Sequence, residues 1–340
     1  MKKYVNLFVF VFMIGACLSQ GRAQTKSAVS YKNPVVDIAM PDPTVIKATD
    51  GYFYVYATES TRNVPIMKSK DLVEWTYCNT AFTNKTRPRF EPKAGIWAPD
   101  INYINGKYVL YYAMSVWGGE QTCGIGVATA DSPQGPFTDH GKMFRSNEIG
   151  VQNSIDPSLL QYEGRNYLVW GSFRGIYVIE LTADGLSIMP GAKKKRIAGT
   201  AFEAVYIHKH GDYYYMFASI GSCCQGVKST YKVVVGRSKK VWGPYKDKTG
   251  KPMLKNGYSL VIGANDHFVG NGHGSQIIRD DAGQDWLLYH GFSRSTPENG
   301  RILLLDQIKW DQEGWPYVEG GSPSYETQKA PVFNLSLIHI

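Results

Sequence analysis

Five polar residues open five similar apolar segments of the chain, and four of them are carboxylic acids. They are Asp42, Asp100, Asp156, Glu203 and His273. Burying an unpaired carboxylate costs several kcal/mol, so such a group finds water, finds a partner or has a shifted pKa. One residue of this kind is common at a sheet edge. Five of them at equivalent places predict a shared site.

The elements that would position these residues form an internal repeat. Each segment has a polar head, an apolar strand, a glycine-containing turn and an aromatic strand, as in DPTVIKATDGYFYVYAT from Asp42 and DPSLLQYEGRNYLVWGS from Asp156. The heads are 58, 56, 47 and 70 residues apart, which suits a four-stranded blade with its loops. The stretches IGVATADSPQGPF and VVVGRSKKVWGPY resemble further blade strands.

Five such units predict an all-β protein, a five-bladed β-propeller over residues 30–333. Aromatic residues make up 13% of the chain and there are 35 glycines, with few long helical patterns. The innermost strands of a propeller run in the same direction around a central channel. The five heads are therefore expected to converge at one mouth of that channel.

The N-terminus has the pattern of a secretory signal. Two lysines precede an apolar stretch from Val5 to Ala16 that is too short to span a bilayer as a helix. We predict a signal peptide over residues 1–23 and an exported protein, periplasmic, extracellular or anchored in a bacterial outer membrane. Cleavage after Ala23 competes with a lipoprotein-type site that would leave Cys17 as a lipid anchor.

The charge and the cysteine content of the chain argue against two other classes: nucleic-acid-binding proteins and proteins with a cysteine-bound metal. Removing residues 1–23 deletes three basic residues and no acid, so the formal charge of +8 falls to +5. The basic run at residues 193–196 is typical of a solvated loop, and no nucleic-acid binding is expected. Outside the signal the cysteines are Cys78, Cys123 and the adjacent pair Cys223 and Cys224. A bridge between any two of these three sites is conceivable, and no metal-binding cysteine pattern occurs.

The five heads and their neighbours resemble glycoside hydrolase family 43 from about Asn33 to Tyr317. The motifs MPDPTVI, GIWAPDI, NSIDPSLL, FEAVYI and GNGHGSQI are similar to the family's five blade starts, in the same order. The stretch SCCQGVKSTYKVVVGRS resembles the family's α-1,5-L-arabinanases. The resemblance implies that the substrate is arabinan, a side chain of pectin in plant cell walls.

The resemblance also implies an inverting hydrolysis. Asp42 would be the general base for water, Glu203 the general acid, and Asp156 the carboxylate that orients Glu203 and raises its pKa. Apolar neighbours would keep Glu203 protonated near neutral pH. Inversion requires base and acid carboxyl groups roughly 6.5–9.5 Å apart, which leaves room for water.

Other residues are expected to assist. Trp97 would stack on a sugar, although a core position is the alternative. Asn153 and Ser172 would bind sugar hydroxyls, and Asp100 is read as a structural hydrogen-bonding residue. The resemblance implies that His273 binds a calcium ion completed by water. The cysteine pair would form a vicinal disulfide or two packed thiols that shape a substrate subsite.

We expect an endo-acting enzyme, because the segment with the cysteine pair resembles endo enzymes. We also expect the protein to be a monomer. An exo-acting α-L-arabinofuranosidase or β-xylosidase is the nearest alternative, and a non-catalytic carbohydrate-binding propeller is the alternative from another class. Two positions depart from the family pattern: Arg174 stands where tryptophan is expected, and Gly274 where asparagine is commoner. The tail 334–340 fits no blade.

Overall fold

The computed structural model describes residues 29–334. The predicted signal peptide, the candidate lipid anchor Cys17 and the tail from residue 335 onward lie outside the described residues. Within the described part of the chain, no helix is long and apolar enough to cross a membrane.

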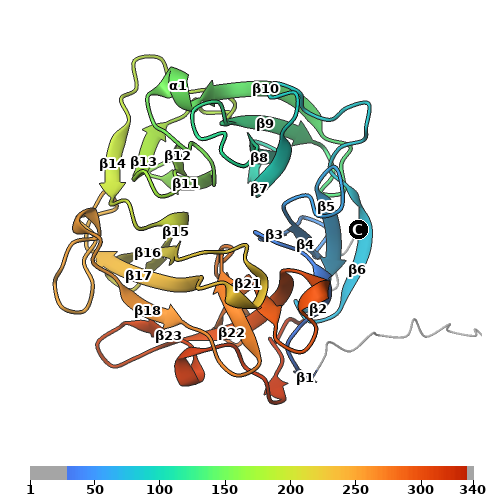
Figure 1. The fold of residues 1–340 in the computed structure, drawn as a ribbon, viewed down its shortest axis with the longest axis vertical. Helices are drawn as coiled ribbons and strands as arrows, with labels where there is room; N and C mark the ends of the chain where they lie inside the picture. The colour runs from blue at the N-terminus through green and yellow to red at the C-terminus, as the bar shows by residue number, and fades with distance from the viewer. Residues whose placement is uncertain (1–28, 335–340) are drawn as a thin grey trace, which may run out of the picture.

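The fold is a five-bladed β-propeller, as the repeat predicts (Figure 1). Each of the first four blades is an antiparallel sheet of four consecutive strands.

The first blade contains β3 (Thr44–Lys47), β4 (Phe53–Tyr56), β5 (Pro65–Ser69) and β6 (Trp75–Thr80). The second contains β7 (Gly95–Ile104), β8 (Lys107–Ser115), β9 (Gly124–Ala130) and β10 (Thr138–Arg145). The third contains β11 (Ser158–Tyr162), β12 (Arg165–Trp170), β13 (Ile176–Glu180) and β14 (Lys195–Ala198). The fourth contains β15 (Glu203–His210), β16 (Tyr213–Ile220), β17 (Lys232–Ser238) and β18 (Ser259–Ile262).

The fifth blade closes the ring with a strand from the start of the chain. Its order is β19 (Phe268–Gly272), β21 (Asp285–Ser293), β22 (Ile302–Trp310) and β2 (Val36–Ala39). Two short strands add to it: β20 (Ile278–Arg279) pairs with β21, and β23 (Pro316–Tyr317) pairs with β22. A further pair, β1 (Ser30–Tyr31) with β24 (Gln328–Lys329), joins the two ends of the described chain.

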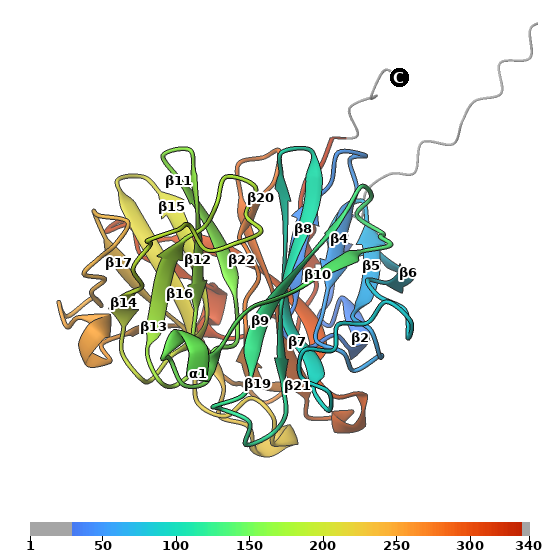
Figure 2. The ribbon, with the colours of Figure 1, turned by 90° about the horizontal axis from the view of Figure 1, so that it is seen from above.

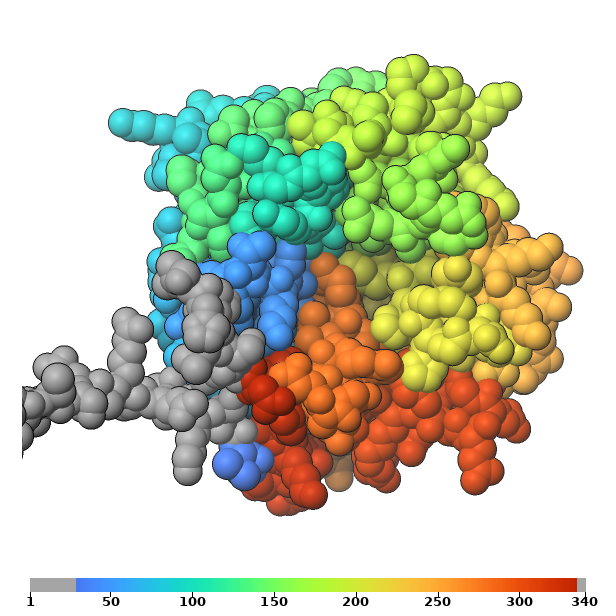
Figure 3. Space-filling view, turned by 180° about the vertical axis from the view of Figure 1, so that it is seen from behind, coloured from blue at the N-terminus to red at the C-terminus, as the bar shows by residue number. Residues whose placement is uncertain are grey.

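Helical structure among the described residues is confined to single turns. They are α1 (Ser146–Ile149) and the 3-10 turns Gly226–Lys228, Met253–Lys255, Pro297–Asn299 and Glu319–Gly321. The blades therefore form the body of the molecule, as the ribbon seen edge-on also shows (Figure 2). In the space-filling view from behind, the segments follow one another around the molecule in chain order (Figure 3).

The core lies between neighbouring blades rather than inside any one of them. Five large apolar clusters occur, one for each pair of adjacent blades. Successive side chains of a strand point to opposite faces of its sheet, so one strand serves two clusters. In β21, Leu287 and Tyr289 pack toward the fourth blade, whereas Trp286 and Leu288 pack toward the first. This explains why the blade strands are continuous apolar runs.

Candidate active site

Each blade head contains a residue with a left-handed backbone. These residues are Asp42 (φ 53°), Ala98 (φ 40°), Asp156 (φ 55°), Ala204 (φ 54°) and His273 (φ 50°). A residue other than glycine pays a steric cost there, and such strain collects at functional sites. The pairing register shifts around this residue in β7 and β15. The left-handed residue thus marks the equivalent position in all five blades.

A cavity of about 700 Å³ opens at this end of the channel. Its walls include all seven residues assigned to the site from the sequence: Asp42, Trp97, Asn153, Asp156, Ser172, Glu203 and His273. The expected convergence is therefore observed for four of the five heads.

Asp100 is the exception, and its expected place at the mouth is wrong. It lies two residues beyond the left-handed Ala98, is fully buried and does not line the cavity. It accepts hydrogen bonds from the Tyr206 hydroxyl at 2.7 Å and the Leu159 backbone N–H at 2.7 Å. Burial raises the pKa of Asp100 to about 6 despite these bonds. Its role is to join three blades deeper in the channel, which agrees with the structural reading.

Asp42 is held in its charged form. Its Oδ1 accepts from Arg301 Nη1 at 2.8 Å and lies 3.2 Å from His273 Nδ1, and its Oδ2 accepts from Thr58 Oγ1 at 2.6 Å. Burial by itself would raise the pKa of Asp42, but the charges of Arg301 and His273 hold it well below the usual range. The backbone N–H of Asp42 also donates to His290 Nδ1 at 3.0 Å.

Glu203 is buried, and a chain of hydrogen bonds fixes one of its oxygens. Ser172 Oγ donates to Glu203 Oε2 at 2.6 Å, and Asn153 Nδ2 donates to Ser172 Oγ at 3.0 Å. The Tyr231 hydroxyl also lies beside Glu203 and favours its charged form. Burial raises the pKa of Glu203 more than Ser172 and Tyr231 lower it. In this structure Asn153 and Ser172 position the carboxyl group, a role that the sequence reading had not given them.

Asp156 lies between the other charged groups. Its Oδ2 accepts the backbone N–H of Ala204 at 3.1 Å, which ties it to the residue after Glu203. Burial raises the pKa of Asp156 to about 8, helped by the charges of Glu203 and Asp42 and opposed by His273. Two nearby buried carboxyl groups do not both ionise readily, so Asp156 and Glu203 together retain a proton near neutral pH.

His273 lies beside the three carboxyl groups of Asp42, Asp156 and Glu203. Burial disfavours its charged form, but Asp42, Asp156 and Glu203 raise the pKa of its imidazole above the usual value. One ring nitrogen is already engaged by Asp42. Calcium takes six to eight oxygen ligands, and around His273 the described side chains form no group of three mutually close ligand atoms. The protein alone therefore does not complete a calcium site here.

Aromatic and sulfur surfaces form the rest of the cavity wall. Trp97 is half-buried and packs against Trp117, with ring centroids 5.5 Å apart, and Trp117 is 79% exposed. Cys223 and Cys224 form a vicinal disulfide on the wall, and Cys78 and Cys123 are free. Of the two expectations for the cysteine pair, the disulfide is confirmed.

The structure shows what surrounds Arg174 and Gly274, the two residues that depart from the family pattern. Arg174, in place of an aromatic residue, forms an ion pair with the cavity residue Glu120 at 2.8 Å. A Cβ atom on Gly274 would lie 3.0 Å from Leu287 Cδ1, so a larger residue there needs that side chain to move.

Four residues around the carboxyl groups were not predicted: Thr58, Tyr231, His290 and Arg301. Tyr231 belongs to the Ser-Thr-Tyr part of the cysteine-pair segment, and Arg301 begins an apolar strand as the blade heads do. Thr58 follows the aromatic strand β4 and His290 lies within β21, and neither carries a comparable signal.

Comparison with known proteins agrees with this geometry. The sequence profile described as glycosyl hydrolases family 43 matches residues 31–316. The chain is 37% identical over 290 residues to an extracellular endo-α-(1→5)-L-arabinanase of Bacillus subtilis, covering 81% of this chain and 86% of that protein. It is 36% identical over 307 residues to an extracellular exo-α-(1→5)-L-arabinofuranosidase of Cellvibrio japonicus, covering 82% and 86%.

A solved structure shows the same architecture. An α-L-arabinanase of Cellvibrio cellulosa in complex with arabinohexaose matches with a TM-score of 0.76 and 34% identity, covering 85% of this chain and 98% of that one. The fold, the carboxyl groups and these matches define a glycoside hydrolase. The chain belongs to glycosyl hydrolases family 43.

Proposed function

We propose that the protein hydrolyses α-1,5-L-arabinofuranosidic bonds inside arabinan chains, with inversion at the anomeric carbon. The observation that carries this is the different state of three carboxyl groups in one cavity. Arg301 holds the pKa of Asp42 well below its usual range, whereas burial raises the pKa values of Asp156 and Glu203, which together retain a proton near neutral pH. The similarity to the B. subtilis endo-arabinanase and to the arabinohexaose complex supports arabinan as the substrate.

In this mechanism Asp42 removes a proton from water as the water attacks the anomeric carbon. Glu203 gives its proton to the leaving glycosidic oxygen. Asp156 accepts the backbone N–H of Ala204 and so orients the segment next to Glu203. When Asp156 is ionised, its negative charge disfavours ionisation of Glu203 and raises the pKa of that acid. Trp97 and Trp117 offer apolar faces on which furanose rings can stack.

The general acid is tested by Glu203→Gln. Glutamine keeps the size of the side chain and a hydrogen-bond acceptor for Ser172, but it has no proton to donate. Turnover of linear arabinan is expected to fall by about 10²- to 10⁴-fold, the usual contribution of general acid catalysis. Glu326→Gln, at an exposed position, is the matched control. Undiminished turnover in Glu203→Gln would show that another group supplies the proton.

Exo action is the second candidate, because the C. japonicus exo enzyme is almost as similar to the chain as the endo enzyme. Products of linear arabinan separate the two modes. Endo action gives a mixture of oligosaccharides and an early fall in viscosity, whereas exo action gives one small product from the start. Nitrophenyl pentosides test for arabinofuranosidase and β-xylosidase activity. The anomer released first, followed by proton NMR, tests inversion.

A calcium ion at His273 is part of the proposal, with water supplying most of its ligands. Metal analysis of the purified protein, followed by activity after chelation, tests it. If the protein is fully active without calcium, the proposed ion is not needed for the reaction.

We also propose that the protein is exported, which is supported by relatives that are named extracellular. A monomer is proposed as well. Mass spectrometry of the mature N-terminus distinguishes cleavage after Ala23 from a lipidated Cys17. Light scattering gives the oligomeric state.

A further inference from the structure

A second group of chemically capable side chains lies at the other end of the channel. β15 begins at the catalytic Glu203 and ends at His210. At about 3.3 Å per residue the two ends of this strand are about 20 Å apart. His208, His210 and Asp285 gather at the far end, and none of them lines the catalytic cavity.

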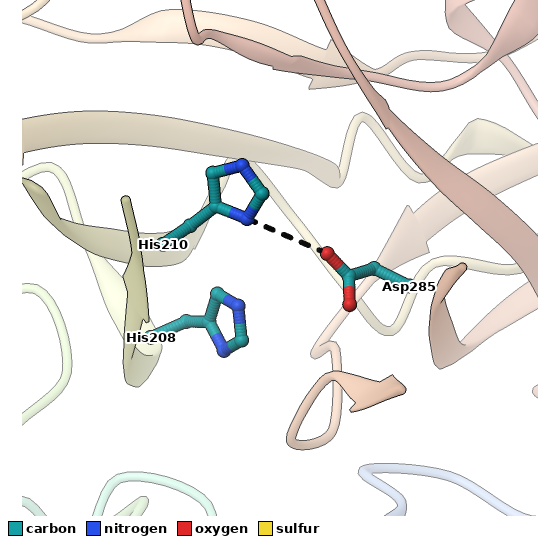
Figure 4. A group of neighbouring side chains, drawn as sticks. All are labelled: His208, His210 and Asp285. Carbon is teal, nitrogen blue, oxygen red and sulfur yellow. Dashed lines mark ion pairs between the residues drawn. The ribbon is translucent and has the colours of Figure 1, made fainter. Parts of the chain in front are cut away.

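These three residues have the composition and the spacing of a metal site. One ligand atom from each lies within 4.8 Å of the other two, and His210 Nδ1 is 3.6 Å from Asp285 Oδ2. His208 and His210 are two residues apart on one strand, so their side chains leave the same face. Figure 4 shows the two imidazole rings side by side, turned toward the carboxylate.

Two further observations point to a missing ligand. Nε2 of His208 is buried and has no hydrogen-bond partner in the described part of the chain, although buried polar atoms rarely go without one. The His210 ring lies flat against Trp310, with ring centroids 3.7 Å apart, which fixes the orientation of that imidazole. Trp310 Nε1 also donates to Asp285 Oδ2 at 2.8 Å, so the carboxylate is oriented as well.

We propose that His208, His210 and Asp285 bind a divalent transition-metal ion, with Zn²⁺ as the best match, and that the ion fastens the fourth blade to the closing blade. Two imidazoles and one carboxylate suit Zn²⁺, and a water molecule would complete a tetrahedron. Zinc bonds of this kind place ligand atoms about 3.3 Å apart, so side-chain shifts of about an ångström are enough. His208 and His210 come from β15 in the fourth blade, and Asp285 begins β21 in the fifth.

Arg279 competes with the ion for Asp285. It donates to both carboxylate oxygens, at 2.8 and 2.9 Å, but its own side chain is 56% exposed. The exposed arginine can move into solvent, but the Asp285 side chain is only 1% exposed, so its charge then needs another partner, which the metal ion supplies. Removal of the positive charge of Arg279 is therefore expected to tighten metal binding.

The test is a titration of the untagged, chelator-treated mature protein with Zn²⁺, read by calorimetry and by the thermal unfolding midpoint. One ion is expected to bind and to raise the midpoint. His208→Ala and His210→Ala should each weaken binding by at least about tenfold. Arg279→Ala should strengthen it by about fivefold, through loss of a competing charge. His140→Ala, an exposed histidine in β10, is the matched control.

His210→Ala is the safer of the two ligand variants, because His210 is less buried than His208. Circular dichroism and arabinan turnover show whether each variant is folded. Absence of zinc binding by the unaltered protein would overturn the proposal. So would equal binding by folded His210→Ala, or weaker binding by Arg279→Ala.

Discussion

At the scale of single residues, the site depends on neighbours that set opposite protonation states in similar carboxyl groups. Asp42 and Asp156 are both buried heads of blades. Arg301 contacts Asp42 directly, whereas the nearest charges to Asp156 include two carboxylates. The difference in chemistry therefore comes from the surroundings and not from the side chains themselves.

Arg301→Met should move the acidic limb of the pH profile of kcat/KM to higher pH. Arg301 stabilises the ionised base, so its removal raises the pKa of Asp42, and the base is then protonated at pH values where it is now charged. A shift of about one pH unit or more is expected from loss of a direct ion pair. Arg294→Met, which removes an arginine outside the cavity, should leave the limb unchanged. An unshifted limb in Arg301→Met would contradict this account of Asp42.

Asp156→Asn should abolish most activity and yet stabilise the protein at alkaline pH. The pKa of Asp156 rises from 3.8 to about 8 on folding, so the folded state binds its proton more tightly than the unfolded state. The associated stability is present below about pH 4 and is lost as the pH rises to 8. Urea unfolding should show the variant about 1–3 kcal/mol more stable than the parent at pH 8 and little different at pH 4. Equal destabilisation at both pH values would contradict the raised pKa.

At the scale of elements, each blade head has a left-handed residue at the equivalent position, but the side chain that reaches the cavity does not always belong to that residue. The equivalent residues are Asp42, Asp156 and His273 in three blades but Ala98 and Ala204 in the other two. Glu203 precedes this position by one residue and still faces the cavity, whereas Asp100 follows it by two and lies deeper. The motifs could be aligned from the sequence, but a shift of one or two residues within a head could not be seen there.

The disulfide between Cys223 and Cys224 is an element of the cavity wall, so its removal should affect substrate binding more than chemistry. The double variant Cys223→Ser and Cys224→Ser is expected to raise KM for arabinan by about five- to tenfold, equivalent to about 1 kcal/mol, with kcat little changed. Cys78→Ser, which alters a free cysteine outside the cavity, is the control. A loss of kcat with unchanged KM would assign the disulfide to the chemical step instead.

At the scale of the whole molecule, closure of the ring by β2 links the start of the chain to its last blade (Figure 1). Val36 is buried in the cluster between the fifth and first blades, and Tyr31 donates a hydrogen bond to the Leu305 carbonyl at 2.8 Å. The carboxyl groups of the cavity come from several blades, so an open ring would disturb the site even though no residue of β2 lines the cavity.

A chain that begins at Met40 should therefore lose stability and activity together. It lacks the buried side chains of Tyr31 and Val36, which contribute about 3–5 kcal/mol by burial. A fall in the unfolding midpoint of about 5–8 °C is expected for a protein of this size. A chain that begins at residue 27 keeps β1 and β2 and should match the parent. If both chains unfold at the same temperature, the strand is not needed for closure.

The sequence by itself determined the repeat, the number of blades and the three carboxyl groups proposed as catalytic, because each blade repeats the same pattern of polar head and apolar strands. Only the tertiary structure decided the partners of those groups: Thr58 reaches Asp42 from just beyond the end of β4 in the first blade, whereas His290 and Arg301 reach it from the last blade. It also decided that Asn153 and Ser172 hold Glu203, and that Asp100 lies below the cavity. Protonation states follow from burial and from charges in space, and neither is written in the spacing of residues along a chain.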